Sequence, residues 1–169
     1  MSAHVVSLRA MEPEDLDFLY GVENDRETWG VSNTSVPYSR YVLHDYIANA
    51  SNDIYADGQV RLIIVDADGA TVGMADVFDF DAAHRRAEVS IVVRSGFRRR
   101  GYALNAIGQV VEYARHTLRL HQLYAIVAED NEPSLRLFAK CGFERCSLLK
   151  EWLFDGEKYK DAIVMQKIF

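Results

Sequence analysis

Cysteine is scarce in this sequence, and so are the usual marks of secreted and membrane proteins. Only Cys141 and Cys146 occur among the 169 residues, too few for a disulfide framework or a zinc site, so we expect no metal. No apolar run approaches the ~20 residues that span a bilayer, and residues 1–10 lack the basic start and long apolar core of a secretory signal. We therefore expect a cytoplasmic protein that does not associate with membranes.

Proline and positive charge are also in short supply. The chain has three prolines and no linker, repeat or low-complexity tract, so we expect a single domain over residues 1–169. A hydrophobic content of 49% is enough for a sizeable core. The 19 Lys and Arg residues against 25 Asp and Glu residues give a formal net charge of -6. This balance argues against nucleic acid as a partner and fits a cationic substrate better.

Hydrophobic periodicity predicts a mixed α/β protein. Apolar residues three or four apart indicate helices, and alternation or short apolar runs indicate strands. The predicted strands are 5–9, 60–65, 71–78, 87–93, 123–127, 145–154 and 158–168, and the predicted helices are 12–23, 40–49, 104–118 and 132–141. Residues 29–37 resemble a loop, and residues 66–69 resemble a hairpin turn. The resulting order is β-α-α-β-β-β-α-β-α-β-β.

A group of arginines stands out in this acidic chain. Four of the seven positions from 94 to 100 are arginine, between a predicted strand and a predicted helix. A helix N-terminus already carries partial positive charge, so arginines there favour a bound anion, such as a phosphate held by backbone N–H groups. Gly101 would let such a ligand approach the backbone closely. The alternative is a solvated turn with no ligand.

Two motifs carry a family resemblance. Residues 98–103 have the pattern R-x-x-G-x-A after a strand, and residues 131–143 read NEPSLRLFAKCGF. They resemble the acetyl-coenzyme A motif Q/R-x-x-G-x-G/A and the segment N-x-x-[AS]-x-x-[LFYI]-[YF]-x-x-x-G-F of the GCN5-related N-acetyltransferases (GNAT). Both motifs in this order, about thirty residues apart, are more specific than either alone. Residues 79–88 and 151–159 are similar to segments of the bacterial spermidine N-acetyltransferases of that family, a group that grades into ribosomal-protein N-terminal acetyltransferases.

The resemblance implies an acyl-CoA N-acyltransferase fold, in which helices flank a mixed, mostly antiparallel sheet with one splayed strand pair. It implies acetyl transfer from acetyl-CoA to an amine by direct attack. The pyrophosphate would lie on residues 98–103, and the strand around residues 91–93 would offer N–H groups to the thioester and pantetheine. The coenzyme-binding residues implied in this way are Ile91, Val92, Val93, Arg98, Arg99, Arg100, Gly101, Tyr102, Ala103, Asn131, Ser134, Phe138 and Lys140.

Glu88 is the first candidate for a catalytic group. An alkylamine has a pKa near ~10 and must lose a proton before it attacks, so the site needs a base or an orienting carboxylate. Glu88 lies on the strand that leads to the arginine turn, on the same face as Ser90 and Val92 by strand alternation. A salt bridge from Glu88 to Arg85 or Arg86 is the structural alternative.

The general acid is the point where this sequence departs from the family. The spermidine enzymes have a tyrosine, the presumed acid, where this chain has Phe138. Tyr102, Tyr124, Ser134 or water could substitute, and we take Tyr124 and Ser134 as catalytic candidates with Glu88. The thiolate could also leave without specific acid help, because a thiol with a pKa of roughly 8.5 is a tolerable leaving group.

Three hypotheses about function follow. The first is an N-acetyltransferase acting on a small, polyamine-like amine such as spermidine. An acidic cluster of Asp76, Asp79, Asp81 and Glu88 could steer such a cation, and the alternative is a solvated loop. The second is acetylation of a ribosomal or other protein N-terminus. The third is a catalytically weak acetyl-CoA-binding module. Residues 32–38 lack the acids that bind regulatory polyamine in the spermidine enzymes, and the edge of a hairpin-ended sheet often pairs in homo-oligomers.

Overall fold

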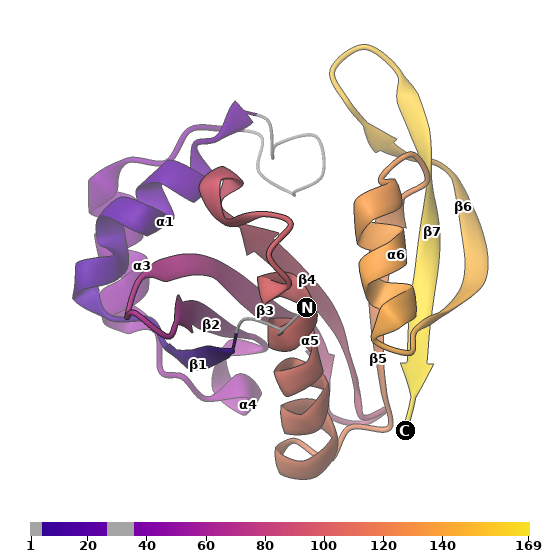
Figure 1. Cartoon of the computed structure of the whole chain (residues 1–169), viewed down its shortest axis with the longest axis horizontal. Helices are drawn as coiled ribbons and strands as arrows, with labels where there is room; N and C mark the ends of the chain where they lie inside the picture. Colours follow the sequence, from indigo (N-terminus) through magenta and orange to yellow (C-terminus); the bar gives the residue numbers. More distant parts are fainter. Residues whose placement is uncertain (1–4, 27–35) are drawn as a thin grey trace.

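The computed structural model describes residues 5–26 and 36–169. Figure 1 shows helices on both faces of a single twisted sheet. The strands are β1 (Val6–Ala10), β2 (Val60–Asp66), β3 (Thr71–Asp81), β4 (Arg86–Val93), β5 (Gln122–Ala128), β6 (Glu144–Phe154) and β7 (Tyr159–Ile168). The α-helices are α1 (Leu16–Glu23), α3 (Arg40–Asn49), α4 (Ile54–Asp57), α5 (Tyr102–Glu112) and α6 (Glu132–Lys140). Two 3-10 turns, η1 (Pro13–Asp15) and η2 (Ser95–Phe97), and a π-helical turn, η3 (Tyr113–Thr117), complete the elements of the described residues.

The seven strands lie in the order β1-β2-β3-β4-β5-β7-β6. Within the described ranges, β4 and β5 are parallel and every other neighbouring pair is antiparallel. A parallel pair needs a crossover connection, and α5 provides it. The predicted fold, a mixed and mostly antiparallel sheet with flanking helices, is confirmed.

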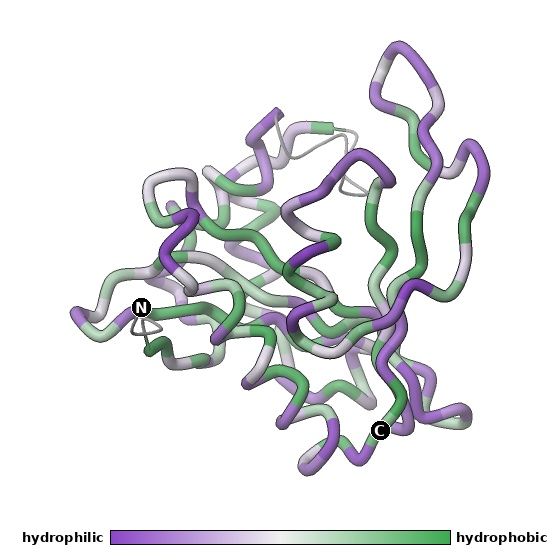
Figure 2. Tube along the Cα trace, turned by 45° about the vertical axis from the view of Figure 1, so that its right-hand side comes forward, coloured by the Kyte–Doolittle hydropathy of each residue, from purple (hydrophilic) through white to green (hydrophobic). Residues whose placement is uncertain are grey.

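Two apolar clusters lie on opposite faces of the sheet. The larger joins α5 and α6 to the central strands and contains Ala87, Val89, Ile107, Val110, Leu123, Ala125, Leu135 and Phe138. The smaller joins α1 and α3 to the other face and contains Leu19, Leu43, Ile47, Ile63 and Met74. Figure 2 shows hydrophobic stretches along the strands, whereas the tip of the β6–β7 hairpin is hydrophilic.

Strand β4 contributes to both faces. Ala87 and Val89 are buried in the larger cluster under α5, whereas Val92 packs against the smaller cluster under α1 and α3. Because side chains alternate along a strand, Glu88 and Ser90 face the same side as Val92. The opposite packing of Val89 and Val92 agrees with the alternation predicted for this strand.

Some local features differ from the sequence prediction. The four-residue helix α4, capped by Asp53 and ended by Gly58 at a φ of 69°, was too short to give a periodic signal. The predicted helix 104–118 continues from α5 into the π-helical turn η3, so its last turn is wider than an α-helix. Most of the predicted loop 29–37 lies outside the described residues. None of the helices described is long and apolar enough to cross a membrane.

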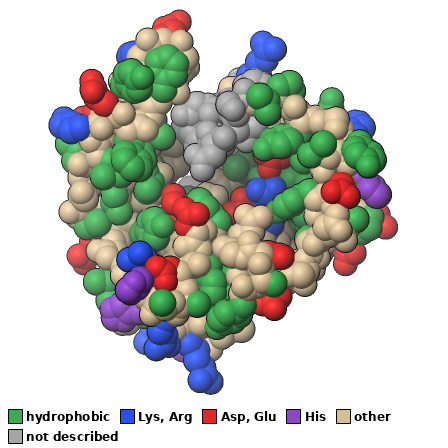
Figure 3. Space-filling model, turned by 180° about the vertical axis from the view of Figure 1, so that it is seen from behind, with side chains coloured by type: hydrophobic (Ala, Val, Ile, Leu, Met, Phe, Trp, Pro, Cys, Tyr) green, Lys and Arg blue, Asp and Glu red, His purple; other side chains and the backbone are tan. Residues whose placement is uncertain are grey.

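The β6–β7 hairpin extends beyond the body of the molecule. β6 is the outer strand of the sheet, and large apolar side chains stand in solvent along the hairpin: Leu148, Trp152, Phe154 and Tyr159 are exposed to 45%, 56%, 55% and 64%. Figure 3 shows green side chains on this part of the molecule, at the upper left. An exposed apolar edge of this kind commonly pairs with another chain.

Candidate active site

The site is built around a fork between β4 and β5. The two strands pair only over Arg86–Glu88 with Gln122–Tyr124, and no ladder pairs follow beyond Glu88. In Figure 1 they meet near the lower edge of the sheet and separate upward. The divergence leaves residues 89–93 without a strand partner on the β5 side, so backbone groups on this edge, apart from the Val93 carbonyl that Arg98 binds, can meet a ligand. The splayed strand pair expected around Ile91, Val92 and Val93 is therefore present.

Strand β3 supports the free end of β4 closely from its other side. A Cβ atom at Gly73 would stand 2.3 Å from the carbonyl oxygen of Val92 and 3.1 Å from Cα of Val93, so only glycine permits this approach. The position of the fork therefore depends on a glycine outside both motifs.

The arginine turn follows the end of β4. Arg98 donates from Nε to the carbonyl oxygen of Val93 at 3.0 Å, and the guanidinium groups of Arg94 and Arg100 lie over the Phe97 ring. Arg99 has a φ of 61° and Gly101, the N-cap of α5, a φ of 83°. No salt bridge of the described residues involves the arginines at 98, 99 or 100.

This turn has the properties of an anion site. A Cβ at Gly101 would meet nothing within 4 Å, so its backbone faces open space at the start of α5. The first N–H groups of an α-helix have no intrahelical partner, and they attract negative charge together with the three exposed arginines. Tyr102 is 6% exposed and its ring packs 6.2 Å from that of Phe97, so its backbone rather than its hydroxyl lies at the turn.

Helix α6 starts on the far side of the fork. Asn131 caps it, because its Oδ1 accepts a hydrogen bond from the Ser134 N–H at 3.3 Å. Ser134 and Phe138 are four residues apart and share one face of the helix. Phe138 is 4% exposed and stacks edge-on against Phe143 at 5.1 Å, so its ring is part of the core. Lys140 is exposed in the last turn.

Glu88 occupies the last paired position of the fork. Burial raises its pKa to about 7, the charge of Asp79 adds to the increase, and the backbone N–H of Ile126 partly offsets it. The suggested salt bridges to Arg85 and Arg86 are absent from the described residues: Arg85 donates to the Arg119 carbonyl, and Arg86 pairs with Asp81. Glu88 is therefore a half-buried carboxyl that changes protonation near neutral pH.

A bulge in β3 brings Asp79 near Glu88. Phe78 pairs with Glu88, and the register then shifts before Asp81 pairs with Arg86, leaving Asp79 with a φ of 47°. The sequence prediction of one acidic cluster is wrong in part. Asp76 is bound to Arg61 and Asp81 is bound to Arg86, so within the described residues only Asp79 lies beside Glu88 without a salt bridge to a cation.

Tyr124 lies directly opposite Glu88 on β5. Burial raises the pKa of its hydroxyl, with further increases from the charges of Glu88 and Asp79. The phenol is therefore protonated at neutral pH.

A cavity of about 570 Å³ lies farther along β4, between its end and α1. Its lining includes Phe18 and Gly21 of α1, Val92 and Val93 of β4, and Arg98 of the arginine turn. It opens on the same face of β4 as Glu88, because Val92 and Glu88 share that face. The α1 residues carry no motif, and their role became visible only from the packing of α1 on the sheet.

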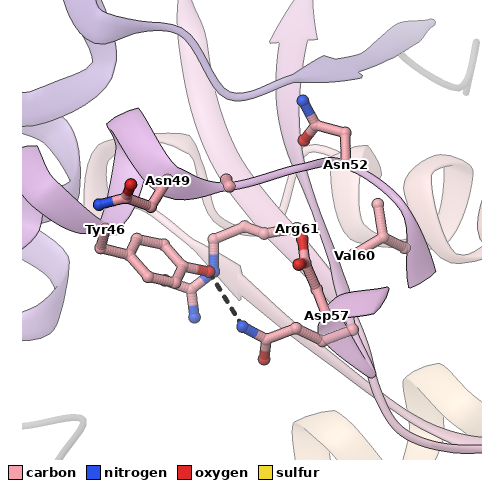
Figure 4. A pocket seen from close by; sticks show the side chains of 8 residues that line it. Tyr46, Asn49, Asn52, Asp57, Val60 and Arg61 are labelled. Carbon is pink, nitrogen blue, oxygen red and sulfur yellow. Dashed lines mark hydrogen bonds between the residues drawn. The ribbon is translucent and has the colours of Figure 1, made fainter. Parts of the chain in front are cut away.

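A second cavity of about 240 Å³ lies among α3, α4 and β2 (Figure 4). Arg61 crosses its wall, with Nε 2.7 Å from Asp76 Oδ1, Nη1 2.8 Å from Glu23 Oε1 and the guanidinium 5.5 Å from the Tyr46 ring centroid. This ion-paired group was not predicted from the sequence. Its signal was one charge within each of two apolar strands, Arg61 and Asp76, which are paired in register.

No group of three or more His, Cys, Asp or Glu side chains within residues 5–26 and 36–169 could hold a metal ion.

Comparison with known proteins assigns the fork to a family. The family model described as "Acetyltransferase (GNAT) domain" matches residues 6–144. The chain therefore belongs to the GNAT acetyltransferases, as the two motifs predicted. The predicted activity, acetyl transfer from acetyl-CoA to an amine, is confirmed, and acetyl-CoA is the cosubstrate.

Within this family, relatives with named activities cover nearly the whole chain. The spermidine N(1)-acetyltransferase of Escherichia coli (strain K12) is 29% identical over 168 residues, 97% of this chain and 86% of that protein. The spermidine N-acetyltransferase of Vibrio cholerae in complex with CoA and spermine superposes with a TM-score of 0.84 at 26% identity, over 96% of this chain and 95% of that one. A dodecameric structure of the Vibrio cholerae enzyme has a TM-score of 0.82 at 27% identity, over 96% and 93% of the two chains.

Proposed function

We propose that the acceptor is a primary amine of a small polyamine-like molecule, such as spermidine. One observation carries the proposal: at the fork, Glu88 and Asp79 lie together, and no salt bridge of the described residues pairs either one with a cation. An ammonium group would relieve the repulsion between the two carboxylates. The named activities of the relatives from Escherichia coli and Vibrio cholerae support the same class of acceptor.

The coenzyme would bind across the fork. Arg98, Arg99, Arg100 and the backbone of residues 101–103 would hold the pyrophosphate, in keeping with the open helix N-terminus and the absence of acidic partners in the described residues. The free edge at residues 91–93 would bind the pantetheine amides and polarise the thioester carbonyl. Asn131 and Lys140 would contact the coenzyme from the α6 side.

Glu88 would accept the proton of the acceptor ammonium. The neutral amine nitrogen then attacks the thioester carbon and a C–N bond forms. The C–S bond breaks, coenzyme A leaves as a thiolate, and this thiolate takes up the second amine proton, so the products are a neutral amide and a free thiol. A base whose pKa is close to the working pH is efficient in this role, and the raised pKa of Glu88 meets that condition. The proton reaches Glu88 directly or through one water.

Ser134 is the candidate donor to the departing thiolate. It precedes Phe138 by one helical turn and is half-buried, so its hydroxyl lies on the same side of α6 as the ring that replaces the family tyrosine. A hydroxyl hydrogen bond to the thiolate supplies part of the stabilisation that proton donation would supply.

We also propose that the chain self-associates through the β6–β7 hairpin. The exposed side chains of Trp152, Phe154 and Tyr159 support this, as does the dodecameric structure of the Vibrio cholerae relative. Sedimentation velocity of the wild type and of Trp152→Glu would test it. A monomeric wild type contradicts self-association, and an unchanged assembly in the variant contradicts the hairpin as its surface.

A panel of amines tests the proposed function. Free-thiol release from acetyl-CoA is measured with spermidine, spermine, shorter diamines, amino acids and short peptides, and coenzyme binding is measured by calorimetry. Turnover confined to polyamines supports the proposal. Turnover with peptides alone supports protein N-terminal acetylation instead, and coenzyme binding without turnover supports a binding module.

A further inference from the structure

Tyr124 and Phe138 lie on opposite faces of β5. Leu123 and Ala125, the neighbours of Tyr124 on the strand, are buried in the larger cluster together with Phe138. Alternation along the strand therefore directs Tyr124 to the other face, which is the face of Glu88, its register partner. The sheet backbone separates the Tyr124 hydroxyl from the α6 side of the fork, where the family resemblance places the general acid.

The surroundings of Tyr124 match an ammonium group. The charged side chains that act on it are Glu88, Asp79 and the Arg86–Asp81 pair, whose atoms are 3.2 Å apart. The one cation among these four is already paired with a carboxylate. The ring is half-buried, so an amine beside it would be partly desolvated, a condition that strengthens cation–π attraction.

We propose that Tyr124 is an acceptor-binding residue, whose ring holds the alkylammonium group against Glu88, and that it does not protonate the thiolate. This inference rests on the proposed function. The two faces of β5 then have different functions. The face of Glu88 binds and deprotonates the amine, and the face of Phe138 receives the coenzyme sulfur. It also assigns specificity, because a ring face beside two carboxylates favours an alkylammonium over a neutral or acidic acceptor.

Two substitutions separate acceptor binding from acid catalysis. Tyr124→Leu removes the ring, and we expect the KM for the amine to rise roughly 2- to 30-fold, the range that corresponds to one cation–π contact. The coenzyme Kd should change much less. Tyr124→Phe keeps the ring and removes the hydroxyl, so its effect on the amine KM should be smaller than that of Tyr124→Leu. Tyr41→Leu, at an 80% exposed tyrosine on α3, is the matched control.

The outcomes are distinct. A larger rise of the amine KM in Tyr124→Leu than in Tyr124→Phe, with kcat reduced less than the ratio kcat/KM, supports the inference. A fall of ~10²-fold or more in kcat for Tyr124→Phe, together with loss of the basic limb of the pH profile, would identify a general acid and overturn it. An unchanged amine KM in Tyr124→Leu also overturns it. A wild type that releases no thiol with any amine contradicts the proposed function itself, independently of both variants.

Discussion

Replacing Glu88 by Gln should affect catalysis and stability in opposite directions. The substitution keeps the shape of the side chain and removes its charge. If Glu88 is the base, kcat/KM should fall ~10²- to 10⁴-fold. The wild-type rate should decline as the pH falls through about 7, the pKa of Glu88, because the carboxyl becomes protonated. This acid limb should be absent from the variant.

The effect on stability follows from the same pKa. The folded state raises the pKa of Glu88 from 4.5 to about 7. Well below pH 4.5 the carboxyl is protonated in both the folded and the unfolded state, so it does not change the free energy of unfolding. As the pH rises toward 7, the unfolded state releases this proton and the folded state keeps it, so the free energy of unfolding falls. A change of one unit in pKa corresponds to about 1.36 kcal/mol, so the upper bound of this loss is about 3.4 kcal/mol. We expect roughly 1–2 kcal/mol because the side chain is partly solvated.

Urea unfolding at pH 5 and pH 8 measures this difference. Glu88→Gln should be more stable than the wild type at pH 8 and should lose most of that advantage at pH 5. Glu157→Gln, on an exposed hairpin turn, is the control for a generic change of charge. If Glu88→Gln has the wild-type kcat/KM, Glu88 is not the base. If the variant and the wild type have equal free energies of unfolding at both pH values, Glu88 is not a half-buried carboxyl without a cationic partner.

Three further predictions concern the coenzyme side of the fork. Arg98→Ala with Arg100→Ala should raise the calorimetric Kd of acetyl-CoA roughly 10-fold or more, since hydrogen bonds between charged groups contribute ~1.5–3 kcal/mol each, and an unchanged Kd would disprove the phosphate cradle. Gly73→Ala should displace β4 at Val92, raising the KM of acetyl-CoA and lowering the thermal midpoint; wild-type values would contradict the close approach. Phe138→Ala should destabilise the fold by about 3–5 kcal/mol in urea, and a cost below about 1 kcal/mol would show that the ring is not buried.

Features that depend on short stretches of sequence were predictable. The arginine turn, the start of α6 at Glu132 and the alternation that places Glu88 are each determined within about ten residues, and all three appear where the sequence indicated. The fork itself was expected from the family resemblance rather than from the residues, because hydrophobic periodicity does not reveal where two strands stop pairing.

Features that depend on distant residues were not predictable. Asp76 looked like part of an acidic cluster because its partner, Arg61, lies on another strand and meets it only through the β2–β3 register. The position of Asp79 beside Glu88 requires a β-bulge, which cannot be predicted from a single sequence. The separation of Tyr124 from Phe138 depends on which face of β5 the helix α6 covers, a choice that tertiary packing makes.

The short junction between β4 and β5 divides the sheet into two sectors, β1–β4 and β5–β7. Besides the three paired positions, two hydrogen bonds connect the sectors at one end. The Arg85 side chain donates to the carbonyl of Arg119, and the His121 N–H donates to the carbonyl of Arg85 at 2.7 Å. At the other end a coenzyme bound as proposed would touch both sectors and act as a strut between them. At a hundred times its Kd it would stabilise the folded chain by about 2.7 kcal/mol. The cosubstrate would then be a temporary part of the scaffold, aligning the sector that carries Glu88 with the sector that carries α6 before the amine arrives.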